Sequence, residues 1–250
     1  MMMANRLGTL WGVGVGPGDP ELITLKAVRL LKTAPVVAFP AGRGGKSGIA
    51  QAIVADFLRS HQVQLPLYFP YVHDQKVLTT AWDKAASQVW QYLVQGQDVV
   101  FATEGDASFY STFTYLAQTL QQQHSAAPIR TVSGVCSPLA AAATLGIPLT
   151  MLTQRLMVLP ALYSMSELEA VLDQADVVVL MKVASVYADA WKILHRRNLL
   201  EKSCVVVRAT QPDEQIYRDL NQYPDLELPY FSLLIINCVA PTDEIRALGC

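Results

Sequence analysis

The 250-residue chain has little of what marks several protein classes. Charged residues make up 16% of it and the net charge is −2, so no basic face is present to bind nucleic acid. Its four cysteines are scattered and no two form a C-x-x-C pair, so we expect neither a zinc site nor a disulfide framework. This cysteine usage indicates a reducing, cytoplasmic location and no bound metal.

Long hydrophobic runs and targeting signals are also missing. The start of the chain, residues 1–10, lacks the apolar run and small-residue cleavage site of a signal peptide. The longest apolar stretch, residues 138–152, is broken by Pro148 and by threonines, and it is too short to span a membrane. We therefore expect no membrane partner, and we interpret this stretch as a buried helix followed by a turn.

Short β-branched runs alternate with amphipathic helical patterns, and hydrophobic residues make up 52% of the chain. This alternation predicts an α/β fold with mainly parallel sheet and helices on its faces. Strands are expected at 10–15, 35–39, 98–103, 129–133, 156–159, 176–181, 204–209 and 233–238. The polar segment 121–128 predicts two α/β domains, residues 1–125 and 126–250, and a cleft between them is a natural binding place.

The first loop is rich in glycine but departs from the dinucleotide-binding fingerprint. Residues 12–18 give G-x-G-x-G-x-G, with Pro17 where the fingerprint needs glycine, and the second strand ends in Phe39-Pro40 and not in an acid. Asp19 and Pro20 suit the cap and first turn of a helix. Because one turn needs only one glycine, the density of glycines indicates that another group approaches this backbone closely.

Two further loops follow strands and precede helices. Gly42-Arg-Gly-Gly-Lys-Ser47 imitates a P-loop, although the first glycine of that motif falls on Pro40. Arg43 and Lys46 there either face an acidic ligand or belong to a solvated turn. In the loop after residue 103, the backbone of Gly105 and Asp106 suits a ligand, and the alternative is that Asp106 or Ser108 only caps the next helix.

The remaining motifs are weaker. Residues 132–148 repeat the strand, turn and helix pattern with a run of alanines, and Cys136 has no histidine nearby in the sequence, so it is interpreted as core or pocket wall. The loop 69–74 carries Tyr71 and His73, which suit either acid–base chemistry or a plain turn.

Taken in order, these segments resemble the tetrapyrrole methylase family, and within it the precorrin-2 and cobalt-factor-II C(20)-methyltransferases. The similarity extends over about residues 8–238 and is carried by GVGPGDPEL at 14–22, TLKA at 24–27, EGD at 104–106, YSTF at 110–113, GIPL at 146–149, VVLMKV at 178–183 and PYFSLL at 229–234. Three positions depart from the family pattern, namely Ala107, Ser133 and Cys136. The first two replace prolines, which preset φ, and so loosen two turns.

The resemblance implies two α/β domains of the class III methyltransferase type. It implies S-adenosylmethionine as cofactor, S-adenosylhomocysteine as product, a homodimer, and methylation of carbon 20 of precorrin-2 or cobalt-factor II in cobalamin biosynthesis. The alternatives are another tetrapyrrole C-methyltransferase, such as the uroporphyrinogen-III type, and a non-catalytic tetrapyrrole-binding protein.

The resemblance also implies site residues. Cofactor-binding residues are expected at Glu104, Gly105, Asp106, Phe109, Gly134, Cys136, Ser137, Met181, Ala209, Ser232 and Leu233. Substrate-binding residues are expected at Pro17, Gly18, Asp19, Arg43 and Lys46, the last two as partners of substrate carboxylates. Tyr71, His73 and Tyr110 are the candidates for a base, and none of them is distinguished by the sequence.

Overall fold

A computed structural model describes residues 6–42, 47–70, 72, 74–162 and 164–238. The chain divides into two compact units, residues 1–136 and 137–250. The polar segment 121–128, where the sequence predicts a boundary, lies within the first unit and joins its last helix to its last strand.

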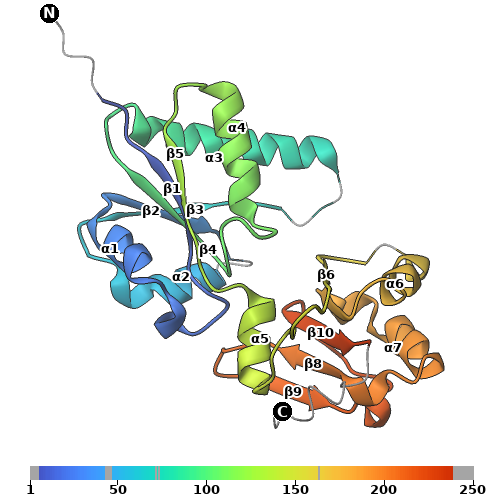
Figure 1. Ribbon diagram of the computed structural model, residues 1–250. Coiled ribbons are helices and arrows are strands. Elements are labelled where there is room, and N and C mark those ends of the chain that lie inside the picture. Colours follow the sequence, from blue (N-terminus) through green and yellow to red (C-terminus); the bar gives the residue numbers. More distant parts are fainter. Residues whose placement is uncertain (1–5, 43–46, 71, 73, 163, 239–250) are drawn as a thin grey trace, which may run out of the picture. The chain divides into compact units, whose positions relative to one another are not determined.

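The first unit is built on a five-stranded sheet of order β3-β2-β4-β1-β5 (Figure 1). Its strands are β1 (Leu10–Gly14), β2 (Val36–Pro40), β3 (Val63–Leu67), β4 (Val99–Thr103) and β5 (Ile129–Val132). All neighbouring strands pair in parallel. Parallel pairing places every carboxyl end, and the loop that follows it, at the same edge of the sheet.

Helices cover both faces of this sheet. One face carries α1 (Leu25–Thr33) and α2 (Ile49–Val54), with the short 3-10 turns η1 (Pro20–Leu22) and η3 (Ala55–Phe57). The other face carries α3 (Gln75–Leu93) and α4 (Thr112–Gln123). In β4, Val99 and Phe101 pack toward α3 and α4, whereas Val100 and Ala102 pack toward α1 and α2. This burial on both faces explains why β4 is a continuous apolar run.

The second unit contains a mixed sheet of order β6-β7-β10-β8-β9. Its strands are β6 (Leu156–Leu159), β7 (Val177–Met181), β8 (Ser203–Val207), β9 (Gln215–Arg218) and β10 (Ser232–Asn237). Only β6 and β7 pair in parallel, while β10 runs antiparallel to both β7 and β8. The expectation of mainly parallel sheet is therefore wrong for this unit, because a fully apolar strand has the same composition in either direction.

The helices of the second unit also lie on both faces of its sheet. On one face α5 (Ser137–Leu145) packs through Ala141 and Leu145, so the run of alanines serves close packing. The other face carries α6 (Met165–Leu172) and α7 (Tyr187–Arg196). Short 3-10 turns lie at η4 (Val183–Ser185), η5 (Leu200–Lys202) and η6 (Leu220–Gln222).

The sequence missed β3 and β9, which are both strands at the margin of a sheet. Only Leu67 of β3 is buried and β3 contains Pro66, and β9 has no buried residue. Strands that face solvent lack the apolar run used to recognise the others. None of the helices in the described residues is long and apolar enough to cross a membrane.

Candidate functional site

The loops that follow β1, β4 and β5 interlock through their backbones. Gly16 and Gly105 bond to each other twice, from the amide of Gly16 to the carbonyl of Gly105 at 3.2 Å and in reverse at 2.8 Å. A Cβ at Gly14 would lie 2.7 Å from the nitrogen of Gly134, and one at Gly134 would lie 2.4 Å from the oxygen of Gly105. The group that approaches the first glycine loop is thus the backbone of its neighbours.

Gly12 has a different reason to be glycine. A Cβ there would lie 2.3 Å from the ring of Phe113, which belongs to α4. The absence of a side chain at Gly12 lets this aromatic ring pack directly on β1, so Gly12 and Gly14 are required by packing of the protein itself, whereas Gly16 is favoured by its φ of 79°.

The first loop ends in the short 3-10 turn η1, which has a side-chain cap. Asp19 accepts a hydrogen bond from the amide of Glu21 at 2.8 Å and caps η1. The first α-helix begins later, where Thr24 accepts from the amide of Ala27 at 3.3 Å. Among the predicted substrate residues here, Pro17 is buried, whereas Gly18 and Asp19 are partly exposed.

Glu104 fixes the start of a helix from a neighbouring strand. Its Oε1 accepts a hydrogen bond from the amide of Ala50 at 3.2 Å, in the first turn of α2, whose N-cap Gly48 has no side chain to do so. Burial raises the pKa of the Glu104 carboxyl above its usual value, against the effect of the backbone hydrogen bonds that it accepts.

Asp106 uses both carboxylate oxygens within the protein. Its Oδ1 accepts from the amide of Ser108 at 2.7 Å, and its Oδ2 accepts from the amide of Gly134 at 2.8 Å. The cap of α4 is instead Ser111, which accepts from the amide of Phe113 at 3.1 Å and shares a hydrogen bond with Thr103 at 3.0 Å. The alternative that Asp106 or Ser108 caps this helix is therefore wrong.

Two aromatic residues lie between Asp106 and α4. The rings of Phe109 and Tyr110 meet edge to face, with their centroids 4.7 Å apart. Tyr110 has a φ of 50°, in the left-handed region that few side chains adopt, and its side chain is exposed.

In the second unit, four predicted cofactor residues gather at one edge of the sheet. Met181 ends β7 and pairs with Leu233 of β10, Ser232 begins β10, and Ala209 follows β8 closely. The hydroxyl of Ser232 donates to the carbonyl of Pro229 at 2.7 Å. Residues that were predicted from distant parts of the sequence thus lie at the same edge of this sheet.

Three residues with side chains have left-handed backbones at the same edge. Lys182, Arg208 and Thr210 have φ values of 53°, 49° and 64°. Such strain often collects at functional sites. The ammonium group of Lys182 lies 5.5 Å from the centre of the Tyr230 ring, a cation–π contact that sequence reasoning missed. The position of Lys182 next to Met181 was the signal that could have found it.

Some predicted residues remain without a structural description. Arg43, Lys46, Tyr71 and His73 lie outside the described residues. Cys136 ends the first unit and Ser137 begins α5 in the second.

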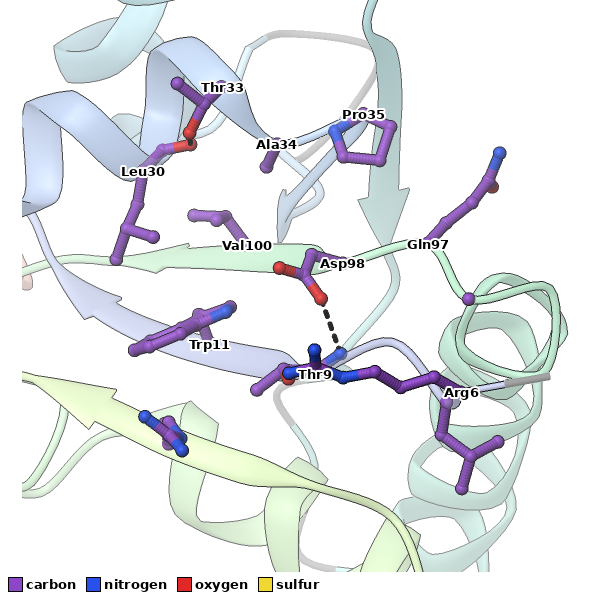
Figure 2. A pocket seen from close by; sticks show the side chains of 13 residues that line it. Arg6, Thr9, Trp11, Leu30, Thr33, Ala34, Pro35, Gln97, Asp98 and Val100 are labelled. Atoms are coloured by element: carbon purple, nitrogen blue, oxygen red, sulfur yellow. Dashed lines mark hydrogen bonds between the residues drawn. The ribbon is translucent and has the colours of Figure 1, made fainter. Parts of the chain in front are cut away.

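A pocket of about 540 Å³ lies at the other edge of the first sheet, between the amino ends of β1 and β4 and the end of α1 (Figure 2). Its lining includes Trp11, whose buried Nε1 has no partner among the described residues, and Arg130, whose guanidinium lies 5.5 Å from the Trp11 ring. None of the predicted site residues lines it, and ligands of parallel sheets bind at the carboxyl ends.

Comparison with known proteins decides the family. The sequence profile of the Tetrapyrrole (Corrin/Porphyrin) Methylases matches residues 9–222. The chain belongs to this family. It is 34% identical to the cobalt-precorrin-2 C(20)-methyltransferase of Salmonella typhimurium, an alignment that covers 92% of this chain and 96% of that protein. It is 32% identical to the precorrin-2 C(20)-methyltransferase of a Sinorhizobium species, over 94% and 97% of the two chains.

Solved structures of other tetrapyrrole methylases share the fold. A cobalt precorrin-4 methyltransferase is 23% identical, with a TM-score of 0.67 over 92% of this chain and 94% of that one. The uroporphyrin-III C-methyltransferase of Thermus thermophilus, solved in complex with S-adenosylhomocysteine, is 23% identical, with a TM-score of 0.64 over 96% of this chain and 100% of that one.

Proposed function

We propose that the protein is an S-adenosylmethionine-dependent methyltransferase that acts on carbon 20 of precorrin-2 or cobalt-factor II in cobalamin biosynthesis. The observation that carries this proposal is the identity of 32–34% to C(20)-methyltransferases along nearly the whole length of both chains. Each of these matches covers more than nine-tenths of both chains.

For the cofactor, we propose two sets of residues, one in each unit. In the first unit these are Glu104, Gly105, Asp106, Phe109, Gly134 and Cys136, and in the second they are Ser137, Met181, Ala209, Ser232 and Leu233. Phe109 in the first unit and Met181 in the second are partly exposed apolar side chains, of the kind that line ligand sites.

The chemistry needs little from the side chains beyond position. S-adenosylmethionine, when bound, supplies a methyl group already activated on a sulfonium, and the electron-rich macrocycle supplies the carbon that attacks it. The protein has to hold the two at reacting distance and exclude water. This requirement agrees with a site made mostly of backbone and apolar groups, and no metal is proposed. Within the described residues, no group of three His, Cys, Asp or Glu side chains could hold one.

For the substrate, which carries many carboxylates, we propose contacts from Pro17, Gly18 and Asp19 and ion pairs with Arg43 and Lys46. Tyr71, His73 and Tyr110 are the proposed candidates for removing the proton from the methylated carbon. The exposed ring of Tyr110 supports its place in this group.

The test is incubation with precorrin-2, with and without cobalt, and S-adenosylmethionine labelled in the methyl group. We expect one labelled methyl per macrocycle, at carbon 20 by NMR. A methyl group on another carbon would favour a different tetrapyrrole methylase, and no binding of S-adenosylhomocysteine by calorimetry would favour a non-catalytic binding protein.

We also propose a cytoplasmic homodimer, on the ground of family membership. Light scattering on the purified protein distinguishes a dimer from the 27.4 kDa monomer, and a monomeric mass that persists at high concentration would contradict this proposal.

A further inference from the structure

Three consecutive residues after β4 each hold a different neighbouring segment. Glu104 accepts from the amide of Ala50 in α2, Gly105 bonds twice to Gly16 after β1, and Asp106 accepts from the amide of Gly134 after β5. Because β4 lies between β2 and β1, its loop lies beside the segments that follow these two strands, and through Asp106 it also reaches past β1 to the loop after β5. We call residues 104–106 the fastening loop.

We propose that the carboxylates of Glu104 and Asp106 are positioning groups, which hold α2 and the loop after β5 against the fastening loop, so that these two residues meet the cofactor through their backbone and not through their carboxylates. The inference concerns how the site is built, and it rests on the proposed function for the ligand that the site receives.

The contacts of Asp106 carry the first half of this inference. Its two oxygens accept backbone amides at 2.7 and 2.8 Å, distances typical of charge-assisted hydrogen bonds. One bond closes the fastening loop on itself at Ser108, and the other holds Gly134, twenty-eight residues further along the chain. A Cβ at Gly134 would collide with Gly105, so the two loops lie in close contact, and the bond from Gly134 to Asp106 joins them there.

The contact of Glu104 carries the second half. The first backbone amides of α2 have no partner within the helix, as in every helix, and its N-cap residue Gly48 makes no side-chain hydrogen bond. The side chain of Glu104 reaches Ala50 from the adjacent strand and takes the place of the missing cap. A carboxylate committed to this bond, and largely withdrawn from water, serves the fold and not a ligand.

The same sheet offers a matched control at its opposite edge. Asp98, directly before β4, accepts from the amide of Thr9 at 2.7 Å, as the dashed line in Figure 2 shows. This is the same kind of bond, carboxylate to backbone amide, between loops of neighbouring strands. This bond lies at the amino ends of the strands. Its loss should therefore lower the stability of the protein without changing the conformation of the loops at the carboxyl ends.

The experiment compares Asp106→Ala, Asp106→Asn and Asp98→Ala. For each we measure binding of S-adenosylhomocysteine by calorimetry, and hydrogen exchange of the Gly134 and Ser108 amides in ligand-free protein. We expect Asp106→Ala to weaken binding by about tenfold or more and to speed exchange at both amides. Asp106→Asn, which keeps one acceptor, should show a smaller change in both, and Asp98→Ala should leave binding within about twofold of the wild type.

A second pair tests Glu104. Glu104→Gln keeps an acceptor for the amide of Ala50 and should preserve slow exchange there, whereas Glu104→Leu, which lacks one, should speed it. In turnover assays the Leu variant should raise the KM for S-adenosylmethionine more than it lowers kcat, since a displaced loop binds less well but leaves the chemistry intact.

Weaker binding by Asp106→Ala with unchanged exchange at Gly134 would overturn the proposal, because it would mean that the carboxylate contacts the ligand directly. Unchanged binding with faster exchange would also overturn it, since the loop would then not matter to the site. If the wild type itself fails to bind S-adenosylhomocysteine, the proposed function fails, and the exchange rates still decide whether Glu104 and Asp106 fasten these segments.

Discussion

In the carboxyl-edge loops of the first sheet, left-handed backbone occurs at two glycines and at Tyr110, whereas in those of the second sheet it occurs at residues with side chains. Gly16 and Gly105 have φ values of 79° and 68° in the first unit, and Lys182, Arg208 and Thr210 have similar values in the second. In the first unit the backbones of neighbouring loops leave no space for a Cβ at Gly14 and Gly134, whereas Gly16 and Gly105 are favoured by their positive φ. Where a side chain persists in a left-handed backbone, it does so at a cost in free energy, and such strain often collects at functional sites.

The largest loss of stability is expected when a side chain is added where two loops of the first unit are in contact. Gly134→Ala places a Cβ 2.4 Å from the oxygen of Gly105, against backbone that cannot move without displacing two loops. We expect the free energy of unfolding to fall by about 3 kcal/mol, measured by urea denaturation. Gly146→Ala is the control, because Gly146 has a φ of 68° with nothing within 4 Å of its Cβ position and should lose only about 1 kcal/mol. Equal losses would contradict the role of close approach.

A smaller effect is expected at Gly12, where the obstacle is a side chain. Gly12→Ala drives a methyl group into the ring of Phe113, and we expect a loss of about 2 kcal/mol. Adding Phe113→Leu should recover part of this loss, because the smaller side chain makes room. A double-mutant cycle measures the coupling, and strictly additive losses would refute it.

The two units should also respond to pH in opposite directions. Burial raises the pKa of Glu104 in the first unit, so the folded protein binds the proton more tightly than the unfolded chain, whose pKa is 4.5. The free energy of unfolding therefore falls as pH rises from 4.5 through the folded pKa. In the second unit, hydrogen bonds from the side chain and the backbone of Arg155 lower the pKa of Asp176 below 3.8, so stability is lost as pH falls through that lower value.

This contrast is measured by amide exchange in each unit across the acid range. Glu104→Gln should reduce the fall in stability of the first unit as pH rises above 4.5. Asp176→Asn should remove part of the loss of stability that the second unit shows at acid pH. A pH response in the first unit that Glu104→Gln leaves unchanged would show that another group causes it.

The smallest change in stability is expected at Lys182, one of the left-handed residues of the second unit. Lys182→Gly removes the strain of a left-handed lysine, which is worth about 1–2 kcal/mol, but adds freedom to the unfolded chain worth about 0.5–1 kcal/mol. A net gain in stability of a few tenths of a kcal/mol is expected. If the lysine is kept for a carboxylate of the substrate, KM for the tetrapyrrole should rise. An unchanged KM would mean that the side chain serves only its contact with Tyr230.

Much of the first unit could be predicted from its residues. The strands at 10–15, 98–103 and 129–133 were found to within one or two residues, because buried strands of a parallel sheet are continuous apolar runs. The carboxyl-edge loops followed from them. The sequence did not predict β3 and β9, because their exposed positions at the sheet margins carry polar residues. It also did not predict that β10 runs antiparallel to its neighbours.

The roles of individual site residues were harder to predict. The sequence proposed a ligand near Glu104 and Asp106, and it offered a helix cap as the alternative for Asp106. The structure shows a third arrangement, in which these carboxylates bond to Ala50, Ser108 and Gly134. Two of these partners lie far away along the chain, so no local pattern could reveal them.

The sequence by itself determined the family, the alternation of strands and helices, and the loops that carry its motifs, since these depend on the order of residues and on local preferences. Only the tertiary structure decided why the glycines of the first loop are glycines and what the acids after β4 hold. Both depend on distances between segments that meet at one edge of a sheet, and such distances exist only after the strands have paired.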